Sequence, residues 1–415
     1  MYKEITECRI CKNKNLKNIF SLGNQYLTGT FPKNKNQEIA YGPVDLMKCV
    51  DGCGLVQLKQ SYDPNLMYGM NYGYRSGLNN SMINHLKQIV NKIKSLVEFK
   101  KEDIVVDIGS NDSTTLQFYD KNLNLIGIDP TGIKFQKYYP EHIMLIPEFF
   151  NSKNLLNLIN PQRAKVITSI AMFYDLEDPN LFMQEINKCL DEDGIWVFEQ
   201  SYLGSMLEEN AYDAICHEHL SYYAFKQIKW MIDKNNFKII DIDFNDTNGG
   251  SFCIFAAKKS SSFKENKEKI SLLEKYEKLK KFDDLNTYEN FVVRVKKHKE
   301  ELNKFINQCL DKNKKIYGYG ASTKGNVIIQ YCNITNEKIK KIAEVNEDKF
   351  GSYTPGSLIE IDSEQNIKKN NPDYLLVFPW HFKEAILARE KDFIDNGGKL
   401  VFPLPILEIV EKINV

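Results

Sequence analysis

The chain has 415 residues, of which 42% are hydrophobic and 27% charged. Its 55 basic residues equal its 55 acidic residues, so no net charge favours binding to nucleic acid or to an anionic membrane. No apolar run approaches the roughly 18 residues of a membrane span, and residues 1–6 lack the apolar core of a signal peptide. The sequence predicts a cytoplasmic protein of two to three domains that acts on a small molecule, and no pattern indicates an oligomer.

Four cysteines near the N-terminus form two pairs with the spacing of metal-binding knuckles. Cys8 and Cys11 are separated by two residues, and Cys49 and Cys53 by three. Each pair lies among turn-forming residues, as expected for hairpins that present thiolates tetrahedrally to zinc. Because four thiolates leave no open coordination position, the pattern predicts a structural Zn²⁺ in a small N-terminal module.

A glycine turn further along the chain is typical of a nucleotide-binding unit. The apolar run 104–108 includes Asp107 and is followed by the turn residues Gly109, Ser110 and Asn111. We expect a buried strand, this tight turn and a helix from Thr114, which together open a doubly wound sheet. A second apolar run ends in Asp129, where a carboxylate would bind ribose hydroxyls.

The details of this unit favour S-adenosylmethionine over a dinucleotide. Asn111 and Ser113 stand where the dinucleotide fingerprint needs glycines, and the Asp107 carboxylate suits a cationic ligand better than a diphosphate. Two antiparallel strands predicted at 237–244 and 251–257 close the region in the manner of class I methyltransferases. A structural glycine turn in another α/β domain is the alternative.

Two of the six histidines form the sequence His217-Glu218-His219, with Tyr222 close behind. In a strand, residues two apart point the same way, so we expect both imidazoles on one face. Such a cluster can be a metal site, an acid–base site or a structural cluster. No third metal ligand follows at a recognisable spacing, which favours a general base flanked by the carboxylate and the tyrosine hydroxyl.

Polar residues before the first predicted helix (78–97) are candidates for a flap over the bound ligands. They are Tyr72, Tyr74 and Ser76. We expect Ser76 to contact the cofactor and the two tyrosines to contact the substrate. Aromatic packing between domains is the alternative.

The C-terminal third contains a charged stretch, 263–315, and a second strand–turn–helix pattern. The charged stretch predicts two solvated helices. In the second pattern, the run 316–320 leads into Ser322 and Lys324, at the start of a helix. A helix N-terminus with these side chains could hold the diphosphate of a sugar nucleotide. A degenerate turn whose glycines only allow tight packing is the alternative.

Taken together, these motifs resemble the bacterial sugar C-methyltransferases, which add a methyl group to a nucleotide-linked 4-keto-deoxysugar. The resemblance runs from Cys8 to the C-terminus. It is carried by the two cysteine pairs and by Gly54-Leu55-Val56-Gln57-Leu58, Val106-Asp107-Ile108-Gly109-Ser110-Asn111-Asp112, His217-Glu218-His219-Leu220-Ser221-Tyr222-Tyr223, Asn248-Gly249-Gly250-Ser251 and Tyr319-Gly320-Ala321-Ser322-Thr323-Lys324-Gly325-Asn326.

The resemblance implies that His219 removes a proton from the sugar carbon beside the ketone, and that the resulting enolate takes the methyl group. It implies Glu218 and Tyr222 as neighbours of this base, and Asn248 as a substrate contact. Three positions differ from the family pattern, with Cys216 before the histidine cluster, Tyr174-Asp175 after the fourth strand and Phe252-Cys253 after Asn-Gly-Gly-Ser. O- or N-methylation of a related sugar and a non-catalytic scaffold are the alternatives.

The predicted fold class is therefore α/β, with three domains. Residues 1–75 form the zinc-binding module, 76–260 the Rossmann-like class I methyltransferase core, and 261–415 a C-terminal Rossmann-like α/β domain.

Overall fold

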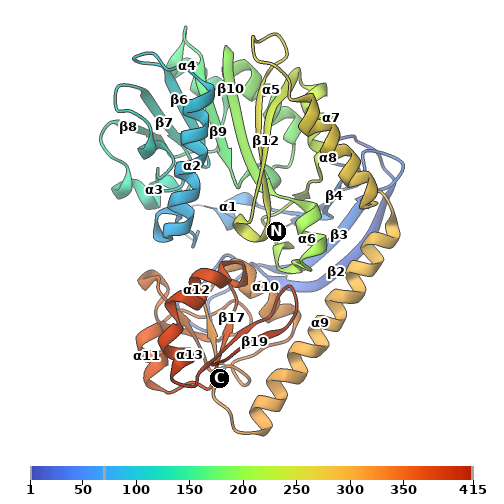
Figure 1. Cartoon of the computed structure of the whole chain (residues 1–415), viewed down its shortest axis with the longest axis vertical. Coiled ribbons are helices and arrows are strands. Elements are labelled where there is room, and N and C mark those ends of the chain that lie inside the picture. The colour runs from blue at the N-terminus through green and yellow to red at the C-terminus, as the bar shows by residue number, and fades with distance from the viewer. Residues whose placement is uncertain (1, 69–71, 413–415) are drawn as a thin grey trace.

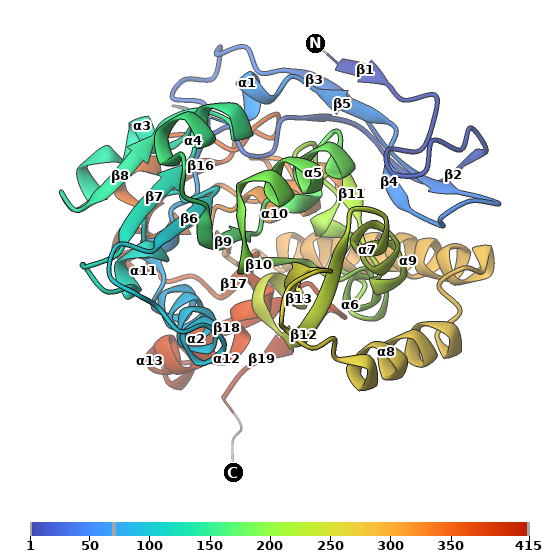
Figure 2. The same ribbon diagram turned by 90° about the horizontal axis from the view of Figure 1, so that it is seen from above.

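The computed structural model describes residues 2–68 and 72–412. It consists of a middle α/β unit stacked on a C-terminal α/β unit, with the N-terminal strands running alongside both (Figure 1). The long helix α9 (Leu285–Asp311) leads from the middle unit down the side of the C-terminal one. Seen from above, the N-terminal strands form a separate layer along one edge of the molecule (Figure 2).

The N-terminal module contains two small antiparallel sheets and a short helix. One sheet pairs β1 with β5, and the other has the strand order β11-β4-β3-β2. The elements are β1 (Tyr2–Glu4), β2 (Leu16–Tyr26), β3 (Tyr41–Cys49), β4 (Val56–Leu58), β5 (Gln60–Tyr62) and α1 (Pro64–Met67). The outer strand β11 (Ser221–Tyr222) comes from far along the chain, so the middle unit is fastened to this module by backbone pairing.

The middle unit is built on a seven-stranded sheet with the order β12-β13-β10-β9-β6-β7-β8. Strands β6 to β10 are parallel, and β13 and β12 continue the sheet antiparallel, as predicted. The strands are β6 (Ile104–Ile108), β7 (Asn124–Ile128), β8 (Ile143–Ile146), β9 (Ala164–Ile170), β10 (Leu190–Ser201), β12 (Phe237–Asn245) and β13 (Ser251–Lys258). Every residue of β6 is buried because helices cover both faces of a parallel sheet.

Helices flank this sheet on both sides in Figure 2. They are α2 (Asn80–Leu96), α3 (Gly132–Phe135), α4 (Ser152–Ile159), α5 (Pro179–Cys189), α6 (Leu203–Glu208) and α7 (Phe225–Lys234). The helix expected from Thr114 was wrong, since only a 3-10 helix forms there, at Leu116–Phe118. Asn111 and Ser113 have φ values of 49° and 65°, and such left-handed residues prevent a right-handed helix from starting directly after the turn.

The C-terminal unit begins with the two predicted helices, α8 (Lys267–Leu279) and α9. Its six-stranded sheet has the order β16-β15-β14-β17-β18-β19, with only the edge strand β19 antiparallel. The remaining elements are β14 (Ile316–Tyr319), α10 (Thr323–Tyr331), β15 (Lys341–Glu344), β16 (Glu360–Ser363), α11 (Glu364–Lys369), β17 (Tyr374–Val377), α12 (Lys383–Arg389), α13 (Lys391–Asp395), β18 (Lys399–Phe402) and β19 (Glu408–Val410).

The predicted strands near 316, 341 and 374 correspond to β14, β15 and β17. The strands β16, β18 and β19 were not anticipated. The domain limits at residues 75 and 260 stay predictions. Among the described residues, none of the helices combines the length and apolar character required to cross a membrane.

Candidate functional site

The glycine turn after β6 joins two neighbouring strands at their carboxyl ends. Gly109 has a φ of 77°, and a Cβ atom there would lie 3.2 Å from Cγ of Met172, so the position requires glycine. The amide of Asn111 donates a hydrogen bond of 2.8 Å to Oδ2 of Asp129, which directly follows β7. The turn and the acidic residue predicted to bind the cofactor are thus brought together.

Two buried carboxyl groups give this region its electrostatic character. Oδ1 of Asp129 accepts hydrogen bonds from the amide and hydroxyl of Thr131, both of 2.6 Å, and burial raises the pKa of Asp129. Asp107 accepts a hydrogen bond of 2.5 Å from the hydroxyl of Thr168, and burial raises the pKa of Asp107 to about 7. Oδ2 of Asp129 accepts a single hydrogen bond and retains a lone pair for a further donor, such as a ribose hydroxyl.

The segment before α2 folds directly over this turn. The amide of Ser76 donates to Oδ1 of Asn111 at 2.9 Å, and Nδ2 of Asn111 donates to the carbonyl of Tyr74 at 3.2 Å. The Tyr74 side chain is 44% exposed, whereas burial raises the pKa of Tyr72 well above its ordinary value. Of the three predicted residues, Ser76 lies at the glycine turn, Tyr72 is partly buried and Tyr74 is partly exposed to solvent.

The histidine cluster does not form the strand that was expected. Residues 216–219 form a turn, and regular pairing begins only with β11. The Nδ1 atom of His219 donates to the carbonyl of Ala214 at 2.7 Å, and its ring centroid lies 4.4 Å from that of Tyr174. Nε2 is therefore the nitrogen with a free lone pair. Burial and the positive charge of Lys324 lower the pKa of His219 to about 4.

His217 lies in different surroundings from His219. It is fully buried, and its ring centroid is 4.6 Å from that of Tyr62 in β5. Burial lowers the pKa of His217 to about 4, so this ring is a neutral packing element between the turn and the N-terminal module. The expectation that both imidazoles share one face was wrong, because the turn separates them.

Glu218 and Tyr222 support the turn from two sides. Oε2 of Glu218 accepts a hydrogen bond of 3.4 Å from the hydroxyl of Thr28, and a Cβ atom on Gly29 would lie 2.5 Å from Oε1. Burial raises the pKa of Glu218. The hydroxyl of Tyr222 donates to the Ala214 carbonyl at 3.4 Å, and thus shares the acceptor used by His219.

Sequence reasoning did not identify a carboxyl group beside this turn. Asp175 follows β9, and its Oδ2 accepts a hydrogen bond of 2.8 Å from the hydroxyl of Tyr68. Burial and the negative charge of Glu218 raise the pKa of Asp175 well above its ordinary value. The departure from the family pattern at Tyr174-Asp175 was the available signal.

The C-terminal unit contributes the first turn of α10. The hydroxyl of Ser322 caps this helix by accepting from the amide of Gly325 at 3.0 Å. The ammonium group of Lys324 donates to the carbonyl of Asn248, so these two predicted substrate contacts are adjacent. Asn326 donates to the carbonyl of Thr28 at 2.7 Å, and this contact fastens the helix to the N-terminal module.

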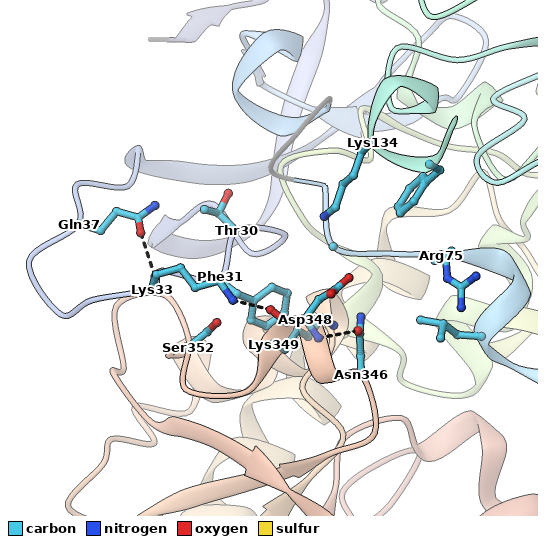
Figure 3. A pocket seen from close by; sticks show the side chains of 13 residues that line it. Thr30, Phe31, Lys33, Gln37, Arg75, Lys134, Asn346, Asp348, Lys349 and Ser352 are labelled. Carbon is cyan, nitrogen blue, oxygen red and sulfur yellow. Dashed lines mark hydrogen bonds between the residues drawn. The ribbon is translucent and has the colours of Figure 1, made fainter. Parts of the chain in front are cut away.

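A basic pocket of about 150 Å³ lies where the three units meet (Figure 3). Its charged lining residues are Lys33, Arg75, Lys134, Asp348 and Lys349, that is, four cations and one carboxylate. Ser352 also lines it, and its fully buried hydroxyl has no hydrogen-bond partner.

The three lysines of this pocket are held by backbone carbonyls, whereas Arg75 forms an ion pair with Asp112. The ammonium groups of Lys134 and Lys349 donate to the carbonyls of Tyr72 and Ala321, both at 2.7 Å. Burial lowers the pKa of both lysines. We call the cavity lined by Lys33, Arg75, Lys134, Asp348, Lys349 and Ser352 the basic pocket. Its excess of positive charge suits an anion.

The predicted cysteine quartet forms a metal site in the N-terminal module. The four sulfur atoms lie within 4.8 Å of one another, and the pairs Cys8–Cys53 and Cys11–Cys49 have Sγ–Sγ distances of 3.5 Å. A tetrahedral zinc ion with Zn–S bonds of about 2.3 Å needs sulfur separations of about 3.8 Å, so the set fits. It is the only group of three or more potential ligands found within residues 2–68 and 72–412.

The fold of the middle unit and the geometry of its glycine turn define a class of protein. A parallel sheet closed by an antiparallel pair, with a glycine turn facing an acidic residue on the next strand, is that of a class I S-adenosylmethionine-dependent methyltransferase. Three family models match the chain in sequence. They describe a zinc binding domain at residues 8–68, a methyltransferase domain at 81–242 and a C-methyltransferase C-terminal domain at 246–405.

The chain is an S-adenosylmethionine-dependent methyltransferase, and the three matched segments together cover most of it in the predicted order. It is 25% identical over 408 residues to the C-methyltransferase NovU of Streptomyces niveus, a match that covers 97% of this chain and 96% of that protein.

Solved structures with related folds include the plantazolicin methyltransferase BpumL with a pentazolic analogue and SAH, at 10% identity and a TM-score of 0.34. That match covers 42% of this chain and 83% of the other. A second is an S-adenosylmethionine-dependent methyltransferase from Clostridium acetobutylicum, at 9% identity and a TM-score of 0.33, with 42% and 92% coverage. Scores this low add nothing to the assignment.

Proposed function

We propose that this enzyme methylates a carbon atom of a nucleotide-linked keto-deoxysugar through an enolate. The observation that carries the proposal is the state of His219. Its Nδ1–H is fixed on the Ala214 carbonyl, and burial keeps the ring neutral with Nε2 unoccupied. A neutral imidazole with one nitrogen anchored and the other free is a general base.

His219 would remove the proton from the carbon beside the ketone. The electrons of that C–H bond form the C=C bond of the enolate, those of the C=O bond move to oxygen, and Nε2 carries the proton. Glu218 and Tyr222 act as positioning residues. Glu218 accepts a hydrogen bond from Thr28, and Tyr222 donates to the Ala214 carbonyl that also binds His219.

S-adenosylmethionine, when bound, supplies an electrophilic methyl group to the enolate carbon and leaves as S-adenosylhomocysteine. We propose that Asp129 holds its ribose and that Asp107 pairs with its ammonium group. Gly109, Ser110, Asn111 and Ser76 would form the backbone wall of the same site. The buried carboxyl groups fit a cationic ligand, since a nearby cation favours the ionised form of each.

For the substrate, we propose that the basic pocket holds the diphosphate. This assignment replaces the phosphate role expected for Ser322 and Lys324, because neither side chain lines the pocket and Ser322 caps α10. Residues 28–31 lead from Glu218 to the pocket, so a diphosphate there would extend the sugar toward His219. Tyr72 would line the path, while the exposed Tyr74 would close over the ligand. We place the reaction in the cytosol, where the five cysteines outside the quartet would stay reduced.

The test is proton exchange in D₂O with nucleotide-linked 4-keto-sugars and no methyl donor. We expect the wild type to incorporate one deuterium beside the ketone and, once the donor is added, to give a product with a new C–C bond. His219→Asn should slow both by about 10²- to 10⁴-fold, and His142→Asn serves as the matched control. An ether or amine product without exchange would contradict the proposal and indicate O- or N-methylation.

A further inference from the structure

Lys324 lies between two segments that border the proposed site of the reaction. On one side, α10 is fastened to residues 28–29 through Asn326, and the hydroxyl of Thr28 donates to Glu218 in the catalytic turn. On the other side, the ammonium group of Lys324 donates to the carbonyl of Asn248 in the loop between β12 and β13. One end of this lysine is thus anchored, and its charge is placed next to the turn that holds His219.

A buried acid balances this charge. Asp213 is fully buried and directly precedes Ala214, whose carbonyl accepts the hydrogen bond from His219. Oδ2 of Asp213 accepts a hydrogen bond of 2.8 Å from Nε1 of Trp380, while Oδ1 has no partner. Burial lowers the pKa of Lys324, and the charge of Asp213 opposes that shift. Burial also raises the pKa of Asp213, and the charge of Lys324 opposes that shift.

The proposed reaction gives Lys324 no role so far, although an enolate requires a donor at its oxygen. When the proton leaves the sugar carbon, negative charge develops on the ketone oxygen, and a fixed charge in a buried site stabilises it far more than water does. The carboxyl groups of Asp175 and Glu218 near the turn, whose pKa values are raised by burial, offer no positive charge. The helix α10, which carries Lys324, packs against residues 212–214, and the carbonyl of Ala214 holds His219.

We propose that Lys324 is a catalytic residue that donates a hydrogen bond to the ketone oxygen of the substrate and stabilises the enolate. The inference rests on the proposed function. The lysine keeps its proton throughout: the C–H electrons become the C=C bond, the carbonyl electrons become the oxyanion beside the ammonium group, and the proton resides on Nε2 of His219. Two domains therefore supply the two halves of the enolisation, the base from the middle unit and the cation from the C-terminal unit.

Phosphate binding and enolate stabilisation by Lys324 predict changes in different kinetic constants. If it bound phosphate, its loss would raise KM and spare kcat. If it stabilises the enolate, its loss lowers kcat for exchange, since the interaction is strongest in the transition state.

The experiment measures exchange of the α-proton of a 4-keto-sugar nucleotide in D₂O for wild type, Lys324→Met and Lys324→Arg. We expect kcat for exchange to fall about 100-fold or more in Lys324→Met with little change in KM, and to recover in part with arginine. Lys349→Met, in the basic pocket, should show the opposite split, with KM raised. Lys314→Met, at an exposed ion pair with Asp373, is the control.

The binding of S-adenosylmethionine to each variant, measured by calorimetry, tests whether it is folded. Exchange by Lys324→Met at the wild-type kcat, or an effect on KM alone, would overturn the role of Lys324 and leave the proposed function intact. No exchange by the wild type with any keto-sugar nucleotide would overturn the proposed function, and the role of Lys324 with it.

Discussion

The Nδ1 atom of His219 lies 2.7 Å from the carbonyl oxygen of Ala214. This single contact fixes the tautomer of the imidazole, because a carbonyl can only accept a hydrogen bond. It also fixes the direction in which Nε2 points. Since Ala214 follows the buried Asp213, whose partner Trp380 belongs to the C-terminal unit, the orientation of the base depends on the packing between two domains.

The first prediction concerns the pH dependence of the base. The pKa of His219 is lowered to about 4, so the ring is unprotonated from pH 6 to 8 and becomes protonated as the pH falls through about 4. We therefore expect the exchange rate to be constant between pH 6 and 8 and to fall on its acid side near pH 4. The rate is measured by deuterium incorporation in short incubations, with stability checked at each pH.

Replacement of the base gives a companion test at constant pH. His219→Asn should lower kcat by about 10²- to 10⁴-fold, the range typical of a lost general base, with unchanged affinity for S-adenosylmethionine. His142→Asn should behave as wild type. A midpoint for the acid limb near 6.5 would contradict the buried, neutral state described here.

The second prediction concerns the cofactor site. Asp129→Ala removes the acceptor of the Asn111 amide and of the proposed ribose hydroxyls. We expect the affinity for S-adenosylmethionine to fall about 10- to 100-fold, as for the loss of one or two hydrogen bonds to a charged group. Calorimetric titration measures it, with Asp120→Ala on the surface as the control. Equal affinities of Asp129→Ala and wild type would exclude this site.

Local patterns made much of the fold predictable. The run around Asp107, the turn at Gly109 and the paired cysteines each encode their structure within a few residues, through burial, backbone conformation or ligand spacing. The closing pair β12 and β13 was predictable because Gly249 and Gly250 mark the loop between two alternating runs.

What the sequence could not show are contacts between distant segments. Tyr68 and Asp175 are 107 positions apart, and Lys324 and Asn248 are 76 apart. No local pattern links such pairs. The wrong expectation that His217 and His219 share one face also arose from a contact between distant segments. The pairing of β11 with β4 begins only at Ser221 and leaves the preceding residues in a turn.

The third prediction concerns the zinc site. Cys11→Ser removes one of four thiolates and should release the metal, because the remaining three leave an open position. We expect a loss of about 4 kcal/mol or more in stability, as is typical when a structural metal is lost. Elemental analysis and thermal unfolding measure these effects. Cys189→Ser, a buried cysteine outside the quartet, is the control. Full zinc content in Cys11→Ser would contradict a four-thiolate site.

The fourth prediction couples cofactor binding to proton release at Asp107. Burial raises the pKa of this carboxyl group to about 7, so it is largely protonated at pH 6 and ionised at pH 8. Only the ionised form attracts the ammonium group of S-adenosylmethionine. Binding at pH 6 must therefore expel a proton, which lowers the observed affinity by up to about tenfold per pH unit below the pKa.

Calorimetry in buffers of different ionisation enthalpy measures this proton directly. We expect close to one proton released per cofactor at pH 6 and almost none at pH 8. Asp107→Asn should bind more weakly at pH 8 and lose most of the pH dependence, since an amide has no proton to release. Any release that remains in this variant belongs to Asp129, whose pKa is also raised by burial. Undiminished release in Asp107→Asn would show that Asp107 is not the group that pairs with the cofactor.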